Sequence, residues 1–208
     1  SLYFFIEVSM TSPTTKLEAV NVMLSTLGEA PVNSLSSGLI DAEMAEQILD
    51  NVNREVQSQG WNFNTETDYT IAVNTVGEIE LPSSFVRVDL AKSETKYRSS
   101  RNEYVQRGNK IYDTIQHTYV INKALKLDAV VLLDFELIPE IARRYIAIRA
   151  SRIFQERVLG STNISAQNRT DEQQAQLALR DMEGDNGDYS IFDDYGTYSV
   201  LDRTSTSK

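Results

Sequence analysis

The chain contains no cysteine and a single histidine, His117, among its 208 residues. The missing cysteines exclude a disulfide framework, so packing alone must hold the fold together. His117 has no second histidine or cysteine with which to share a metal, and we assign it no role. No glycine-rich phosphate-binding loop occurs either. Few groups remain that carry nucleophilic, redox or metal chemistry, and we predict no cofactor and no bound metal.

Long hydrophobic runs are also missing. The opening SLYFFIEVS is apolar, but it is too short to span a membrane and has no basic segment or cleavage site before Met10. We expect Met10 to be the natural start and residues 1–9 to be a vector-derived leader. The sequence therefore predicts neither membrane insertion nor secretion, and it fits synthesis in a bacterial cytoplasm.

Positive charge is scarce, and the formal net charge is −10. This charge argues against non-specific attraction to DNA or anionic lipid. It is also uneven, because residues 138–160 carry five arginines against two acids, whereas residues 171–202 carry nine acids against one base. Copies of the chain could pair these segments across a subunit boundary. The alternative is that both are solvated faces with contacts inside one chain. The candidate subunit interface consists of Arg143, Arg144, Arg149, Arg152, Asp188, Asp193, Asp194 and Tyr195.

Two amphipathic helices are predicted near the N-terminus. Thr15 and Glu18 form a capping box before a run with helical spacing, which ends at Gly28 and Pro31. A second run has apolar residues every four positions from Ile40 and ends at Gln59 and Gly60; they are Ile40, Met44, Ile48, Val52 and Val56. Trp61 and Phe63 follow directly, and we expect them to fold back as a lid on the apolar stripe.

The middle of the chain is rich in short β-type segments. They are YTIAV, EIEL, FVRVDL, EYVQR, KIYD, TYVI and AVVLLDF, separated by turn-forming residues. Gly108-Asn109 lies between two of these segments and is typical of a two-residue hairpin connection. We therefore expect an antiparallel sheet region at residues 66–137.

Two further helices are predicted after the strands. Pro139 suits the first turn of a helix that ends at Gly160 and is apolar around most of its circumference, as expected for a central helix. Thr170 and Gln173 form a second capping box, which starts a helix that we expect to end at Gly184. Its inner face would consist of Ala175, Ala178, Leu179 and Met182. The prediction is an α+β fold: a four-helix bundle (10–65 and 138–185), an inserted β domain (66–137) and an extended C-terminal arm (186–208).

The acidic residues do not define a catalytic or calcium site. No start position in DMEGDNGD places the glycine and acids as an EF-hand loop requires. A pair of carboxylates for glycoside hydrolysis cannot be chosen, because sequence spacing says nothing about their distance in space. The catalytic residues, if any exist, stay unassigned.

The ordered segments resemble the tail tubular protein A family of short-tailed, podovirus-type bacteriophages. The resemblance rests on AVNVMLSTLGEAPVNSL, AEQILDNVNREVQSQGWNFNTE, YVQRGNKIYD and IPEIARRYIAIRASRIFQERVLGS, with the closing DDYGTYSVLDR. These segments occur in the family's order between Met10 and Arg203. The opening helix with its glycine and proline, followed by QSQGWNFN, is the most specific combination.

This resemblance implies a structural virion protein of the phage tail. Its expected role is a head-to-tail adaptor, a ring of about twelve copies with the portal protein, the tail nozzle (tubular protein B) and the tail fibres as partners. DNA would pass through the ring without specific binding. Two alternatives stay open: a tail protein that also hydrolyses host surface polysaccharide, and a monomeric binding module with no affinity for tail components.

Overall fold

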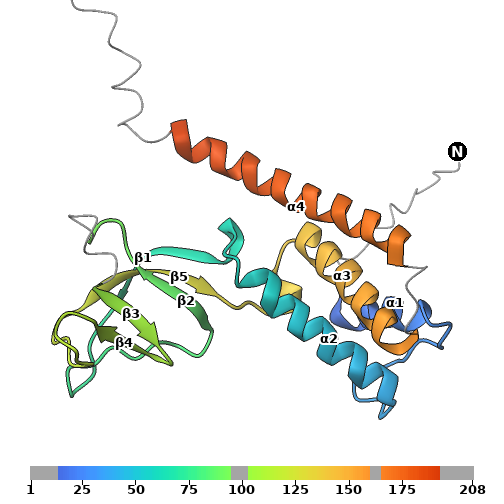
Figure 1. Ribbon diagram of the computed structural model, residues 1–208, viewed down its shortest axis with the longest axis horizontal. Helices are drawn as coiled ribbons and strands as arrows, with labels where there is room; N and C mark the ends of the chain where they lie inside the picture. Colours follow the sequence, from blue (N-terminus) through green and yellow to red (C-terminus); the bar gives the residue numbers. More distant parts are fainter. Residues whose placement is uncertain (1–13, 95–102, 160–164, 193–208) are drawn as a thin grey trace, which may run out of the picture.

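The computed structural model describes residues 14–94, 103–159 and 165–192, and these residues form a helical part and a β part (Figure 1). The described chain contains four α-helices: α1 (Lys16–Ser25), α2 (Ile40–Gln57), α3 (Glu140–Leu159) and α4 (Ser165–Phe192). All strands lie between α2 and α3 and pair antiparallel. The predicted α+β order of elements is therefore confirmed. The predicted leader (1–9) lies outside the described residues.

The first helix begins at the predicted capping box. The Thr15 hydroxyl accepts a hydrogen bond from the Glu18 amide at 3.2 Å, and the Glu18 carboxylate accepts one from the Thr15 amide at 2.8 Å. These reciprocal bonds satisfy amides that a helix start otherwise leaves unpaired. The helix ends at Ser25, and Gly28 follows in the turn with a φ of +80°, a conformation that favours glycine.

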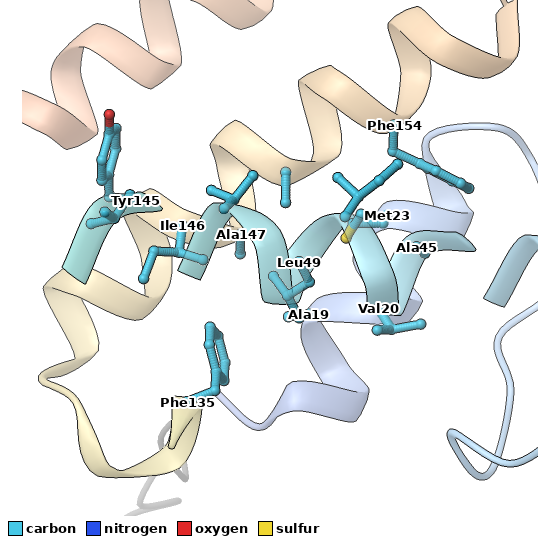
Figure 2. Close-up of a cluster of buried hydrophobic side chains, with 14 of the residues drawn as sticks. Ala19, Val20, Met23, Ala45, Leu49, Phe135, Tyr145, Ile146, Ala147 and Phe154 are labelled. Atoms are coloured by element: carbon cyan, nitrogen blue, oxygen red, sulfur yellow. The ribbon is translucent and has the colours of Figure 1, made fainter. Parts of the chain in front are cut away.

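Helix α3 is the centre of the helical part, as its apolar circumference predicts. It contacts α1, α2 and α4. Figure 2 shows Tyr145, Ile146 and Phe154 of α3 among buried side chains of α1 and α2, including Met23 and Leu49. Helix α4, in contrast, lies along α3 and extends beyond it (Figure 1). The bundle is therefore three helices with a fourth added on one side.

Trp61 closes one end of this core as the expected lid. It is buried, and its indole Nε1 donates a hydrogen bond to the Val56 carbonyl at 2.7 Å. The Phe63 ring lies parallel to it, with the ring centroids 6.4 Å apart. The short helix η1 (Asn62–Asn64) that carries Phe63 leads directly into the β part.

The β part contains a three-stranded sheet and a hairpin. The sheet has the order β1-β5-β2, formed by β1 (Thr65–Ile71), β5 (Leu125–Val131) and β2 (Phe85–Leu90). Strands β3 (Tyr104–Arg107) and β4 (Lys110–Asp113) form the hairpin, in which Arg107 pairs with Lys110 across the predicted Gly108-Asn109 turn. Gly108 has a φ of +63°.

Four strand predictions were wrong in position or kind. The last strand is Leu125–Val131 rather than AVVLLDF, because Leu125, Leu127 and Ala129 alternate inward while Lys126 points outward. Phe135 begins the short helix η3 (Phe135–Leu137) instead. The segments EIEL and TYVI contribute isolated bridges and no strand. The first strand runs from Thr65 to Ile71 rather than over YTIAV.

Helix α4 is longer than predicted at both ends. It begins at Ser165, before the expected cap at Thr170, and it continues through Gly184 to Phe192. A glycine inside a helix costs about 1 kcal/mol relative to alanine but does not end the helix by itself. Residues 186–192 of the expected extended arm are therefore helical, and residues 193–208 lie outside the described part. No helix in the described ranges is long and apolar enough to cross a membrane.

A buried polar network joins the helical part to the β part. The Gln57 side chain is fully buried, donates to the Leu133 carbonyl at 2.9 Å and accepts from the Leu133 amide at 2.8 Å. The Asn64 side chain donates to the carbonyls of Gln57 and Val131, at 2.9 and 3.0 Å. Because each buried amide group finds a partner, the network fixes the chain after β5 against the end of α2.

Candidate subunit interface

The structure places the two halves of the predicted interface differently. The four arginines project from α3, and Asp188 belongs to the last turns of α4. Asp193, Asp194 and Tyr195 lie outside the described residues. The arginines are therefore the half of the interface whose contacts can be examined.

Arg143 serves the fold of its own chain. It is 9% exposed, and its guanidinium donates to the carbonyl of Ile138 and to that of Thr14, both at 2.9 Å. Thr14 is also bound through its amide to the Glu140 carboxylate at 2.9 Å. Arg143 thus ties Thr14, two residues before α1, to the start of α3, and it is not exposed to a partner.

Arg149 and Arg152 meet a single acid of α4. Arg149 binds Glu172 at 2.8 Å and Glu55 of α2 at 2.7 Å. Arg152 binds the other oxygen of Glu172, and it also pairs with Glu156 one turn further along α3, at 3.0 Å. We call these five residues the ionic cluster. It joins α2, α3 and α4, so these two arginines follow the alternative in which charges pair inside one chain.

Electrostatics within the ionic cluster favour the charged forms. Burial alone would raise the pKa of Glu172, but hydrogen bonds from Arg152 and Arg149 outweigh it and bring the pKa below its ordinary value. The hydrogen bond to Glu172 raises the pKa of Arg152. The Arg149 Nε atom is buried and has no hydrogen-bond partner in the described chain. The cluster is therefore charged at neutral pH and sensitive to the loss of Glu172.

Arg144 differs from the other three arginines. It is exposed, and it has no ion-pair partner among the described residues. It lies at a groove of about 770 Å³ between α1, α3 and α4. The apolar lining includes Val22 and Ile141, which are 54% and 40% exposed, and Asp171 supplies a carboxylate. This groove exists because α4 packs on α3 without closing against α1.

One prediction for the inner face of α4, that for Ala178, was wrong. Ala175 and Leu179 are buried against the core and Met182 packs partly against it, as expected for the inner face. Ala178 is exposed and lines the groove instead. Val22 is apolar but lies outside the helical stripe of Leu17, Val20, Leu24 and Leu27, and this was the sequence signal that could have indicated an open apolar surface here.

A second, more polar hollow of about 460 Å³ lies beside α2 and the chain after β5. Asp50, Asp134 and Glu136 line it. Lys16 pairs with Asp50 at 2.9 Å, and its amide donates to Glu136 at 3.1 Å. Two of the three carboxylates therefore hold the start of α1. Within the described ranges, no group of three or more histidine, aspartate or glutamate residues could hold a metal ion.

Comparison with known proteins identifies the family. The family model described as "Tail tubular protein" matches residues 17–189, a range that includes residues of both parts of the fold. The chain belongs to the tail tubular protein family. One relative is the tail tubular protein A of Klebsiella phage KP34, which is 27% identical over 167 residues, or 80% of this chain and 86% of the relative. This tail tubular protein is accordingly a structural component of a phage tail, and its place is the virion tail.

Proposed function

We propose that this tail tubular protein is a head-to-tail adaptor. In this role, about twelve copies form a ring that docks beneath the portal protein, joins it to the nozzle (tubular protein B) and helps to seat the tail fibres. Family membership supports the role in the tail. The open groove, with Arg144 free of any ion pair among the described residues, is the observation that carries the assembly role. An apolar surface that carries the charges of Arg144 and Asp171 is suited to a partner subunit.

The acidic C-terminal residues provide a second proposed contact. Because Arg143, Arg149 and Arg152 are engaged within the chain, they are poor partners for another copy. We keep Asp188, Asp193, Asp194 and Tyr195 as residues that contact a neighbouring subunit or the portal. A variant that ends at Phe192 removes three of these four residues and is expected to weaken assembly while the described fold stays intact.

Net charge suits a DNA conduit. With a formal charge of −10, the subunit repels a phosphate backbone instead of binding it. DNA would then pass through the ring without being held. An electrophoretic assay at low salt, where electrostatic attraction is strongest, should show no retardation of duplex DNA.

Sedimentation velocity with and without the cognate portal ring tests the proposed function. The protein is expected to form a large stoichiometric complex with the portal, even if it is monomeric alone, because the portal can act as a template. Arg144→Glu should reduce the amount of complex. Arg157→Glu is the matched control, because it makes the same charge change at an exposed position of α3 outside the groove. A wild-type protein that never sediments with the portal would contradict the adaptor role.

A further inference from the structure

The start of α2 presents an apolar tip to solvent. Leu39 and Ile40 are 55% and 76% exposed, although Ile40 was expected to belong to the buried stripe. Leu39 occupies the N-cap position, and no side chain caps the helix. A serine, threonine, aspartate or asparagine there would stabilise the helix by about 1 kcal/mol. The chain therefore exposes apolar surface where a polar residue would favour the isolated fold.

Polar residues continue this tip along the same face of α2. Glu43 and Gln47 are exposed and follow Ile40 by three and seven positions, which places the three side chains on one face. Glu43, one turn from Ile40, carries the charge of this set. The opposite face of α2 is buried in the core. The surface at the beginning of α2 is thus an apolar residue followed by a negative charge.

The α3 wall of the groove has the complementary pattern. Ile141, Arg144 and Ile148 line it at the same three- and seven-residue spacing, so apolar side chains flank a positive charge. Two carboxylates also line the groove: that of Glu140, which binds Thr14, and that of Asp171 on α4. Arg144 has no ion pair in the described part of the chain. Leu39 and Ile40 do not line the groove, so the tip and the groove are separate surfaces of one molecule.

We propose that the Leu39–Ile40 tip of one copy seats in the groove between α1, α3 and α4 of the next copy, with Glu43 facing Arg144. This inference rests on the proposed ring and names the contact that would build it. The contact buries apolar surface from both copies and pairs the charge at the groove. Because the two surfaces differ, each copy donates one and receives one, and such a head-to-tail contact can close a ring.

Thiol cross-linking tests this contact, since the natural sequence has no cysteine that could react elsewhere. The variant Ile40→Cys/Ile141→Cys carries one thiol on the tip and one in the groove. Within one copy Ile141 lines the groove and Ile40 does not, so the two thiols lie on separate surfaces. A cross-link inside one copy would leave a monomer and give no ladder.

The variant is treated with a short bifunctional maleimide in the presence of the portal ring, and its fold is checked by circular dichroism. We expect a ladder on a denaturing gel, that is, a series of bands from covalently linked dimers, trimers and larger species. The control Ile40→Cys/Ile115→Cys, with its second thiol on the β part, should give no such ladder. Equimolar Ile40→Cys and Ile141→Cys single variants should give cross-linked pairs and nothing larger.

Each other outcome overturns the contact. A portal complex without a ladder would refute the tip-in-groove contact and leave the adaptor role standing. Absence of both complex and ladder would remove both proposals. A ladder from Ile141→Cys/Tyr195→Cys in place of the tip variant would assign the groove to the C-terminal segment instead.

Charge reversal provides an independent readout. Arg144→Glu and Glu43→Arg should each lower the yield of complex by more than about tenfold, because like charges then face each other across the contact. The double variant Arg144→Glu/Glu43→Arg should restore the yield. Failure of the double variant to recover any complex, while both single variants fold, would contradict the pairing of Glu43 with Arg144.

Discussion

The two sides of α3 are held in different ways. Towards α1 and α2 the helix buries large apolar side chains, among them Tyr145, Ile146 and Phe154, in a continuous core. Towards α4, the partner helix contributes Ala175, Leu179 and a partly buried Met182, and the ionic cluster supplies the rest. The first side is packed mainly by large apolar side chains. The second has fewer large apolar side chains and more charge, and the groove lies open beside it.

On the apolar side of α3, the largest loss of stability is expected from a change at Phe154. This side chain is fully buried, so Phe154→Ala creates a cavity and should lower the free energy of unfolding by about 3–5 kcal/mol. Urea denaturation followed by circular dichroism measures the loss. The exposed Leu177→Ala on α4 is the control and should change stability by less than about 0.5 kcal/mol. Equal effects of the two changes would contradict the burial of Phe154 in the core.

The charged side depends on Glu172. Glu172→Gln removes the charge that Arg149 and Arg152 share and should cost about 2 kcal/mol, since both guanidinium groups then lack their main partner. Hydrogen exchange should quicken in α4 and stay unchanged in α2. Faster exchange in both helices alike would show that α4 is part of one cooperative core.

Lowering the pH should reduce the stability that the ionic cluster gives to the α4 side of α3. The folded-state pKa of Glu172 lies below its ordinary value of 4.5, so its contribution is present above that value and is lost as the pH falls through the lower folded pKa. The stability difference between wild type and Glu172→Gln should be constant from neutral pH to about pH 5 and then shrink towards zero. Denaturation curves at several pH values measure it. A difference independent of pH down to strongly acidic conditions would contradict the ionic role.

A smaller loss of stability is expected from a change at the start of α1. Thr15→Ala removes the side-chain cap and should lower the free energy of unfolding by about 1 kcal/mol, whereas Thr15→Ser should retain most of it. Thermal denaturation compares the two. If both variants lose the same stability, the methyl group rather than the hydroxyl would be responsible.

The smallest change in stability is expected from Arg144→Glu. The side chain is exposed and has no ion pair in the described structure, so the free energy of unfolding should change by less than about 0.5 kcal/mol. The yield of complex with the portal should nevertheless fall by more than about tenfold. A large loss of stability would show that Arg144 supports the fold and would remove it as an interface residue.

Local sequence signals predicted the elements whose cause is local. The Thr15–Glu18 box, the lid formed by Trp61 and the Gly108-Asn109 hairpin each depend on neighbouring residues, and all three are confirmed. The last strand was placed too late because the apolar run AVVLLDF outweighed the alternation that begins at Leu125. The end of α4 was placed at Gly184, although a glycine is only a weak helix terminator.

The candidate interface depended on contacts that sequence does not contain. The four arginines looked alike in the sequence, yet the structure separates Arg144 from the three that bind within the chain. The pairs of Arg152 with Glu156 and of Arg143 with Glu140 could be anticipated, from their four- and three-residue spacing. The role of Glu172 and the open groove depend on how α4 packs, which is a tertiary property.

Hydrogen exchange of the protein alone and in complex with the portal ring tests most directly whether the α4 side of α3 is the assembly surface. The account predicts that α4 and the first turn of α2 exchange quickly in the free subunit and become protected in the complex, whereas the α1–α2–α3 core is protected in both. Unchanged exchange in α4 and at residues 39–42 of a protein that sediments with the portal would contradict it.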